Sequence, residues 1–167
     1  MATGCPTFDR SHDKPPLPGL SKAGEGGITD PRSELIENGL GRAAEALGDV
    51  TQPVIDLFYA RYPDARASFV HHSPSNPASL EAEMVGNTLY YVMRWFENPI
   101  EARIYFDTSV PQHRVALGVS PDWYRGFIEA FLDVVEPAAA LDTETEKAAW
   151  KAVRTGLVGL VERNRHI

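Results

Sequence analysis

The 167-residue sequence has a single cysteine, Cys5, so it contains neither a disulfide framework nor a zinc site built from cysteines. It also lacks any apolar run that approaches the roughly 20 residues of a membrane-spanning helix. The first residues, "MATGCPTFDRSHDK", lack the apolar core of a secretory signal peptide. From these absences we expect a cytoplasmic protein without a membrane partner.

Basic residues are also scarce relative to acidic ones. The 16 Lys and Arg residues are outnumbered by 23 Asp and Glu residues, which gives a net charge of −7, and no basic cluster is present. Nucleic acid and anionic membrane surfaces attract proteins of the opposite charge, so neither is an expected partner. The length is that of one domain with a single core.

The two ends of the chain differ in composition. Residues 1–29 are rich in Pro, Gly, Ser and charge, as in "DKPPLPGLSKAGEGGITD". Such a segment cannot bury enough apolar area to offset the entropy lost on ordering. The sequence therefore predicts a disordered N-terminal tail over residues 1–29 and one folded domain over residues 30–167.

If this division holds, a chain that begins at Asp30 should unfold at nearly the same temperature as the full chain. The reason is that the removed residues contribute no buried apolar surface to the domain. Thermal unfolding of both chains, followed by circular dichroism, measures this. A large loss of stability in the shortened chain would mean that the tail docks on the domain.

Residues 30–167 have the apolar spacing of α-helices, and no segment shows a sustained period-two alternation. Several helix starts can be read directly. Asp30 stands before Pro31, and Ser120 stands before Pro121, which is the order of an N-cap and a first helical residue. Asp142 or Thr143 would cap a last helix as part of a capping box. The predicted class is all-α.

Prolines and polar clusters predict where helices end. Pro63 is expected to end a helix over residues 51–62, and Pro111 is expected to interrupt a weaker helix before His113. The segment "HHSPSNPAS" predicts a loop, which would leave His71 and His72 solvated. A strongly apolar helix over residues 78–96 follows this loop.

His113 is the most informative polar residue. It lies in "QHRVALGVSPDWYRGF", eleven residues before Tyr124 and just before the turn at Gly118. One interpretation is a surface histidine ahead of a helix; the other is a metal ligand held at a fixed distance from that helix. A ligating imidazole is neutral and needs an acceptor for its other ring nitrogen. Ser109, one helical turn earlier, would supply that acceptor through its hydroxyl or carbonyl.

The order of these features is similar to that of the globins, especially bacterial single-domain globins and the haem domain of flavohaemoglobins. It consists of a helix ended by Pro63, Phe69 six residues later, the apolar helix with "EMVGNTLYYVMRWF", and "HRVALGVSPDWY". The resemblance covers about residues 32–165, including "AAWKAV" around Trp150. It implies a globin fold of helices packed around haem b, with His113 as the proximal iron ligand.

The resemblance also implies further cofactor-binding residues. Phe69 would stack on the haem edge, and Tyr124 would line the pocket, although a plain core position is the alternative for each. Val85 would be the distal residue and Leu89 the apolar residue one turn later. Ile55 falls where flavohaemoglobins carry tyrosine, so the distal side is expected to lack hydrogen-bond donors.

The register on the distal side has alternatives, because the loop after Phe69 varies in length among globins. A shift would turn Met84 or Asn87 toward the iron instead of Val85. Tyr90 and Tyr91 are two further candidate donors.

The function implied by this resemblance is oxygen binding and transport, or more generally reversible binding of a diatomic gas such as oxygen or nitric oxide. No flavin or nicotinamide domain is recognisable in the sequence, so nitric oxide dioxygenase activity would need an external reductase. A reductase or a second copy in a homodimer is a candidate partner. The alternatives are a haem-free globin-like sensor or protein-interaction module, and an unrelated helical bundle such as the ligand domain of a regulator.

Overall fold

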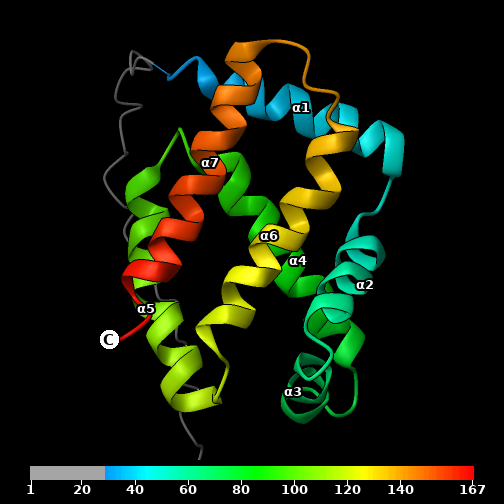
Figure 1. The fold of residues 1–167 in the computed structure, drawn as a ribbon, viewed down its shortest axis with the longest axis vertical. Helices are drawn as coiled ribbons and strands as arrows, with labels where there is room; N and C mark the ends of the chain where they lie inside the picture. The colour runs from blue at the N-terminus through cyan, green and yellow to red at the C-terminus, as the bar shows by residue number, and fades with distance from the viewer. Residues whose placement is uncertain (1–28) are drawn as a thin grey trace, which may run out of the picture.

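The computed structural model describes residues 29–167, which form seven α-helices and no β-strand (Figure 1). This confirms the all-α class predicted for this part of the chain. The expected tail lies outside the described residues except for Thr29. None of the helices within residues 29–167 is both long enough and apolar enough to cross a membrane. The helices are α1 Arg32–Leu47, α2 Thr51–Arg61, α3 Ala65–His72, α4 Pro77–Arg94, α5 Pro99–Leu117, α6 Pro121–Ala138 and α7 Glu144–Arg163.

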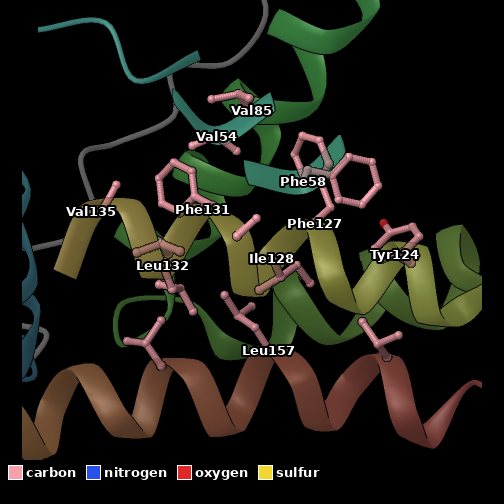
Figure 2. Close-up of a cluster of buried hydrophobic side chains, with 14 of the residues drawn as sticks. Val54, Phe58, Val85, Tyr124, Phe127, Ile128, Phe131, Leu132, Val135 and Leu157 are labelled. Carbon is pink, nitrogen blue, oxygen red and sulfur yellow. The ribbon is translucent and has the colours of Figure 1, made fainter. Parts of the chain in front are cut away.

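Helix α6 forms the centre of the fold and packs mainly against α7, α2 and α1. In Figure 1, α1 crosses one end of the molecule, whereas α3 and the turn between α5 and α6 lie at the other end. The core is made largely of aromatic and β-branched side chains, and Figure 2 shows how α6 presents them toward α2, α4 and α7. Large side chains with less than 2% exposure include Trp150, Phe58, Phe131, Ile36, Leu132 and Leu157.

Two of the three predicted helix starts follow the expected capping. The third, at α1, is shifted by one residue, because the helix begins at Arg32 with Pro31 rather than Asp30 at the cap position. The Asp30 carboxylate still accepts a hydrogen bond from the backbone N–H of Arg32 at 3.0 Å. The Ser120 hydroxyl oxygen accepts one from the backbone N–H of Asp122 at 3.2 Å. Thr143 caps α7, and Glu146 completes the capping box. Each cap pairs backbone donors that a helix leaves unpaired at its first turn.

The prediction that Pro111 interrupts its helix is wrong, because α5 runs unbroken from Pro99 to Leu117 with Pro111 inside it. An interior proline removes one backbone donor, and its ring crowds the carbonyl one turn earlier, so other contacts must stabilise the helix. Tertiary contacts hold the helix just before this point: Phe106 and Val110 are buried, and the Asp107 carboxylate accepts a hydrogen bond from Asn164 Nδ2 at 2.8 Å. The helix ends only at Gly118.

The loop expected around "HHSPSNPAS" begins later than predicted. His71 and His72 form the last residues of α3, and the chain leaves the helix at Ser73. The His72 ring supports this last turn, since its Nδ1 lies 2.9 Å from the Ser68 carbonyl oxygen. The expectation that both imidazoles are solvated is confirmed, since both residues are exposed.

Two glycines of α7 provide a matched test of the packing. A Cβ atom built on Gly156 would lie 2.0 Å from Cζ2 of Trp95, whereas one built on Gly159 meets nothing within 4 Å. Gly156→Ala should therefore destabilise the fold by about 1–3 kcal/mol through overpacking. Gly159→Ala should stabilise it by about 0.4–1 kcal/mol, because alanine has less conformational freedom than glycine in the unfolded chain.

Thermal unfolding of the two variants distinguishes these effects. The melting temperature should fall by roughly 2–4 °C per kcal/mol in Gly156→Ala and rise slightly in Gly159→Ala. Equal melting temperatures for the two variants would mean that the Trp95 ring moves aside without cost.

Candidate functional site

A cavity of about 160 Å³ lies between α2, α3, α4, the C-terminal turn of α5 and the start of α6. Of these elements, α3 and the α5–α6 turn lie at the end of the molecule opposite α1 (Figure 1). When its open mouth is included, about 680 Å³ of space lies between the lining atoms. The mouth is marked by His72 and Leu117, which are both exposed. The lining is Phe58, Ala65, Ser68, Phe69, His72, Leu80, Met84, His113, Leu117, Val119, Trp123, Tyr124 and Phe127.

His113 lies in the wall of this cavity, one turn before the end of α5. Its Nδ1 is 2.8 Å from the backbone carbonyl oxygen of Ser109 and 3.2 Å from the Ser109 hydroxyl oxygen. A carbonyl oxygen can only accept, so Nδ1 must carry the proton and donate it. In the neutral ring the lone pair is then on Nε2, which is the nitrogen available to a ligand. This confirms the predicted geometry between Ser109 and His113.

Tyr124 links this pair to α6. Its hydroxyl is 2.9 Å from the Ser109 hydroxyl, and its ring lies edge-on to the His113 ring, with centroids 5.1 Å apart and an interplanar angle of 88°. Burial is the main cause that raises the pKa of Tyr124 well above its usual value, so the phenol stays protonated. Ser109 and Tyr124 together hold the imidazole in one orientation.

The opposite walls of the cavity are aromatic and aliphatic. The Phe69 and Phe127 rings are stacked with an interplanar angle of 21° and centroids 6.3 Å apart. Phe58 meets Phe127 edge-on at 5.0 Å. Within the described part of the chain, no Asp, Glu, Lys or Arg lines the cavity. A flat apolar ligand would therefore be buried against these rings without meeting an unpaired charge.

The structure brings together three of the five residues predicted to bind a cofactor, namely Phe69, His113 and Tyr124. The other two, Val85 and Leu89, do not line the cavity. Val85 is 4% exposed and belongs to the core, while Leu89 is 37% exposed. Ile55, considered as a distal residue, is also a core residue.

Two side chains of α4 line the cavity, Leu80 and Met84. Met84 is the residue that the alternative register turns inward in place of Val85. Met84 and Leu80 are spaced by four residues, so they share one side of the helix, whereas Val85 and Val92 are buried. The apolar stripe through Val85 therefore points to the core, and a second apolar face that begins at Leu80 points to the cavity. Trp123, in the first turn of α6 beside Tyr124, also lines the cavity and was not among the predicted site residues.

A second, smaller cavity of about 20 Å³ lies next to the first, and Met84, Tyr124 and Phe127 line both. Two of the donors considered for the distal side, Asn87 and Tyr91, line only this smaller cavity. The third, Tyr90, is exposed instead and donates a hydrogen bond to the Glu101 carboxylate at 2.6 Å.

Residues 29–167 contain no group of three or more His, Cys, Asp or Glu side chains arranged to hold a metal ion. His113 is thus not part of a metal centre built from such side chains within this range. Comparisons of the chain with protein-family models, with curated proteins and with solved structures found no match.

Proposed function

We propose that this protein is a haem b-binding protein of the globin type, which binds a diatomic gas such as oxygen or nitric oxide reversibly, with His113 as the axial iron ligand. One observation carries the proposal. The His113 ring faces an apolar cavity while Ser109 occupies its Nδ1, which is the arrangement of a histidine that ligates a metal through Nε2. A haem brings four further nitrogens of its own, so a single histidine suffices.

The residues of the cavity suit a flat apolar group. Phe69 and Phe127 offer parallel faces, and the walls have no charged side chain within the described residues. The cavity itself, at about 160 Å³, is smaller than the roughly 300–1,000 Å³ of ligand pockets. Met84, Tyr124 and Phe127 line both this cavity and the smaller one beside it. A methionine side chain changes shape easily, so movement of Met84 would enlarge the pocket for a haem.

The bound haem would supply the iron that takes up the gas. The protein residues would orient it and keep water away. Ser109 and Tyr124 fix the His113 ring, so its nitrogen lone pair points in one direction. Phe58, Phe69 and Phe127 exclude water from the interior of the pocket.

A titration of the haem-free protein with haemin tests this proposal. Trp123 lies in the cavity wall, so its fluorescence should be quenched as haem binds, with an end point at one haem per chain. Quenching without an end point, or an end point far from one haem per chain, would indicate non-specific adsorption and contradict the proposal.

A further inference from the structure

Asn164, which directly follows α7, is less exposed than any other polar or charged residue within residues 29–167, at 1%. Its Nδ2 donates one hydrogen bond to the Asp107 carboxylate at 2.8 Å and another to the Leu160 carbonyl oxygen at 2.9 Å. Both amide hydrogens are therefore paired. The bond to Asp107 joins the end of α7 to α5, and its loss would leave an unpaired donor in the interior, which is costly.

Asp107 is the residue at which α5 is weakest. A helical N–H donates to the carbonyl oxygen four residues earlier, so Pro111, which has no N–H, leaves the Asp107 carbonyl without its helical donor. The proline ring also crowds that carbonyl. Proline is a common cause of helix kinks, and a kink here would separate the residues before position 111 from those after it. Asn164 thus holds the side chain of the residue at which α5 would bend.

His113 lies after this weak point, whereas Ser109, whose carbonyl oxygen accepts from the His113 Nδ1 at 2.8 Å, lies before it. A kink at Pro111 would pull these two residues apart and release the imidazole. We infer that Asn164 is a positioning residue for His113: by holding Asp107 it keeps α5 closed at Pro111 and so keeps the ring in one orientation. The use of that orientation, to direct Nε2 at an iron, rests on the proposed function.

Two substitutions in α7 serve as matched controls for Asn164→Ala. Arg163 also pairs with the Asp107 carboxylate, but its side chain is 44% exposed, and exposed ion pairs contribute little. Arg163→Ala therefore removes a partner of the same carboxylate and leaves the buried hydrogen bond in place. Gly156→Ala destabilises the fold by overpacking and also leaves that hydrogen bond in place. It shows what a general loss of stability does.

The first measurement is backbone hydrogen exchange of the full-length protein without haem, resolved by residue. Asn164→Ala should speed exchange at residues 113–118 about three- to tenfold relative to residues 103–106, the factor expected for loss of one hydrogen bond. Arg163→Ala should leave this ratio unchanged, and so should Gly156→Ala. An unchanged ratio in Asn164→Ala would overturn the inference.

The second measurement reads the His113 ring directly, since nitrogen NMR of the haem-free protein distinguishes the two neutral tautomers of an imidazole. The proton should stay on Nδ1 in the original protein and in both controls, whereas Asn164→Ala should give a mixture of tautomers. Asp107→Ala, which removes the same hydrogen bond from its more exposed side, should do the same and replaces Asn164→Ala if that variant fails to fold.

A double variant tests the link through Pro111. Pro111→Ala restores the N–H that the Asp107 carbonyl lacks, so Pro111→Ala combined with Asn164→Ala should return His113 to a single tautomer. A single tautomer already in Asn164→Ala, or a mixture that persists in the double variant, would overturn the inference. Both measurements are made without haem. Failure of the original protein to take up haem would therefore defeat the proposed function and leave the positioning of His113 standing.

Discussion

His113→Ala is expected to abolish stable haem incorporation. The Phe-lined walls would still attract the macrocycle, but the bond between the protein and the iron would be gone. Removal of a residue that merely supports a metal ligand costs about 10–100-fold in affinity, so removal of the ligand itself should cost more than about 100-fold. Haemin titration of the variant, followed by absorbance, measures this loss.

Two controls make the result interpretable. Far-ultraviolet circular dichroism should show that His113→Ala keeps its helices, because the side chain is only half-buried. His71→Ala, which alters an exposed histidine outside the cavity, should take up haem normally. If His113→Ala retains haem with an unchanged ferrous spectrum, another residue is the ligand and the assignment of His113 fails.

Met84→Gln is expected to slow oxygen release by about tenfold or more. Met84 lines the cavity from α4 and offers no hydrogen-bond donor. Oxygen in a haem pocket gains partial negative charge, and a hydrogen bond to a charged group contributes about 1.5–3 kcal/mol. Carbon monoxide gains much less charge, so its release should change less. Stopped-flow measurement of both gases gives the two rates.

Leu89→Gln is the matched control, because Leu89 lies on the same helix but is exposed and outside the cavity. It should release oxygen at the rate of the original protein. An original protein that already releases oxygen slowly, and faster after Tyr91→Phe or Asn87→Ala, would contradict the prediction. The smaller cavity would then supply the donor.

Local signals near helix starts were enough to predict several elements correctly. Ser120 and Thr143 each pair a backbone donor of their own helix, so a short stretch of sequence specifies the contact. The contact between Ser109 and His113 was predictable for the same reason, since one helical turn fixes their spacing.

Features that depend on tertiary packing were not predictable in this way. Pro111 would weaken an isolated helix, but burial of Phe106 and Val110 and the pairing of Asp107 with Asn164 keep α5 intact. These stabilising contacts involve residues that are distant in the sequence, such as Asn164 at the end of α7, so the local sequence around Pro111 does not reveal them.

The register of α4 could not be fixed by periodicity alone. The helix has apolar side chains on two faces, one toward the core through Val85 and one toward the cavity through Leu80 and Met84. An amphipathic pattern with a single apolar stripe would have specified the orientation. Whether Met84 or Val85 faces the cavity depends on the positions of α3 and α6. The local sequence of α4 contains no information about those positions.

The absorption spectrum of the purified full-length protein, oxidised and then reduced, tests the central claim most directly. We expect a red protein with a strong Soret band, one haem per chain, and a shift of that band when carbon monoxide is added to the reduced form. A colourless protein that also fails to bind added haemin would contradict the account and would favour a haem-free module.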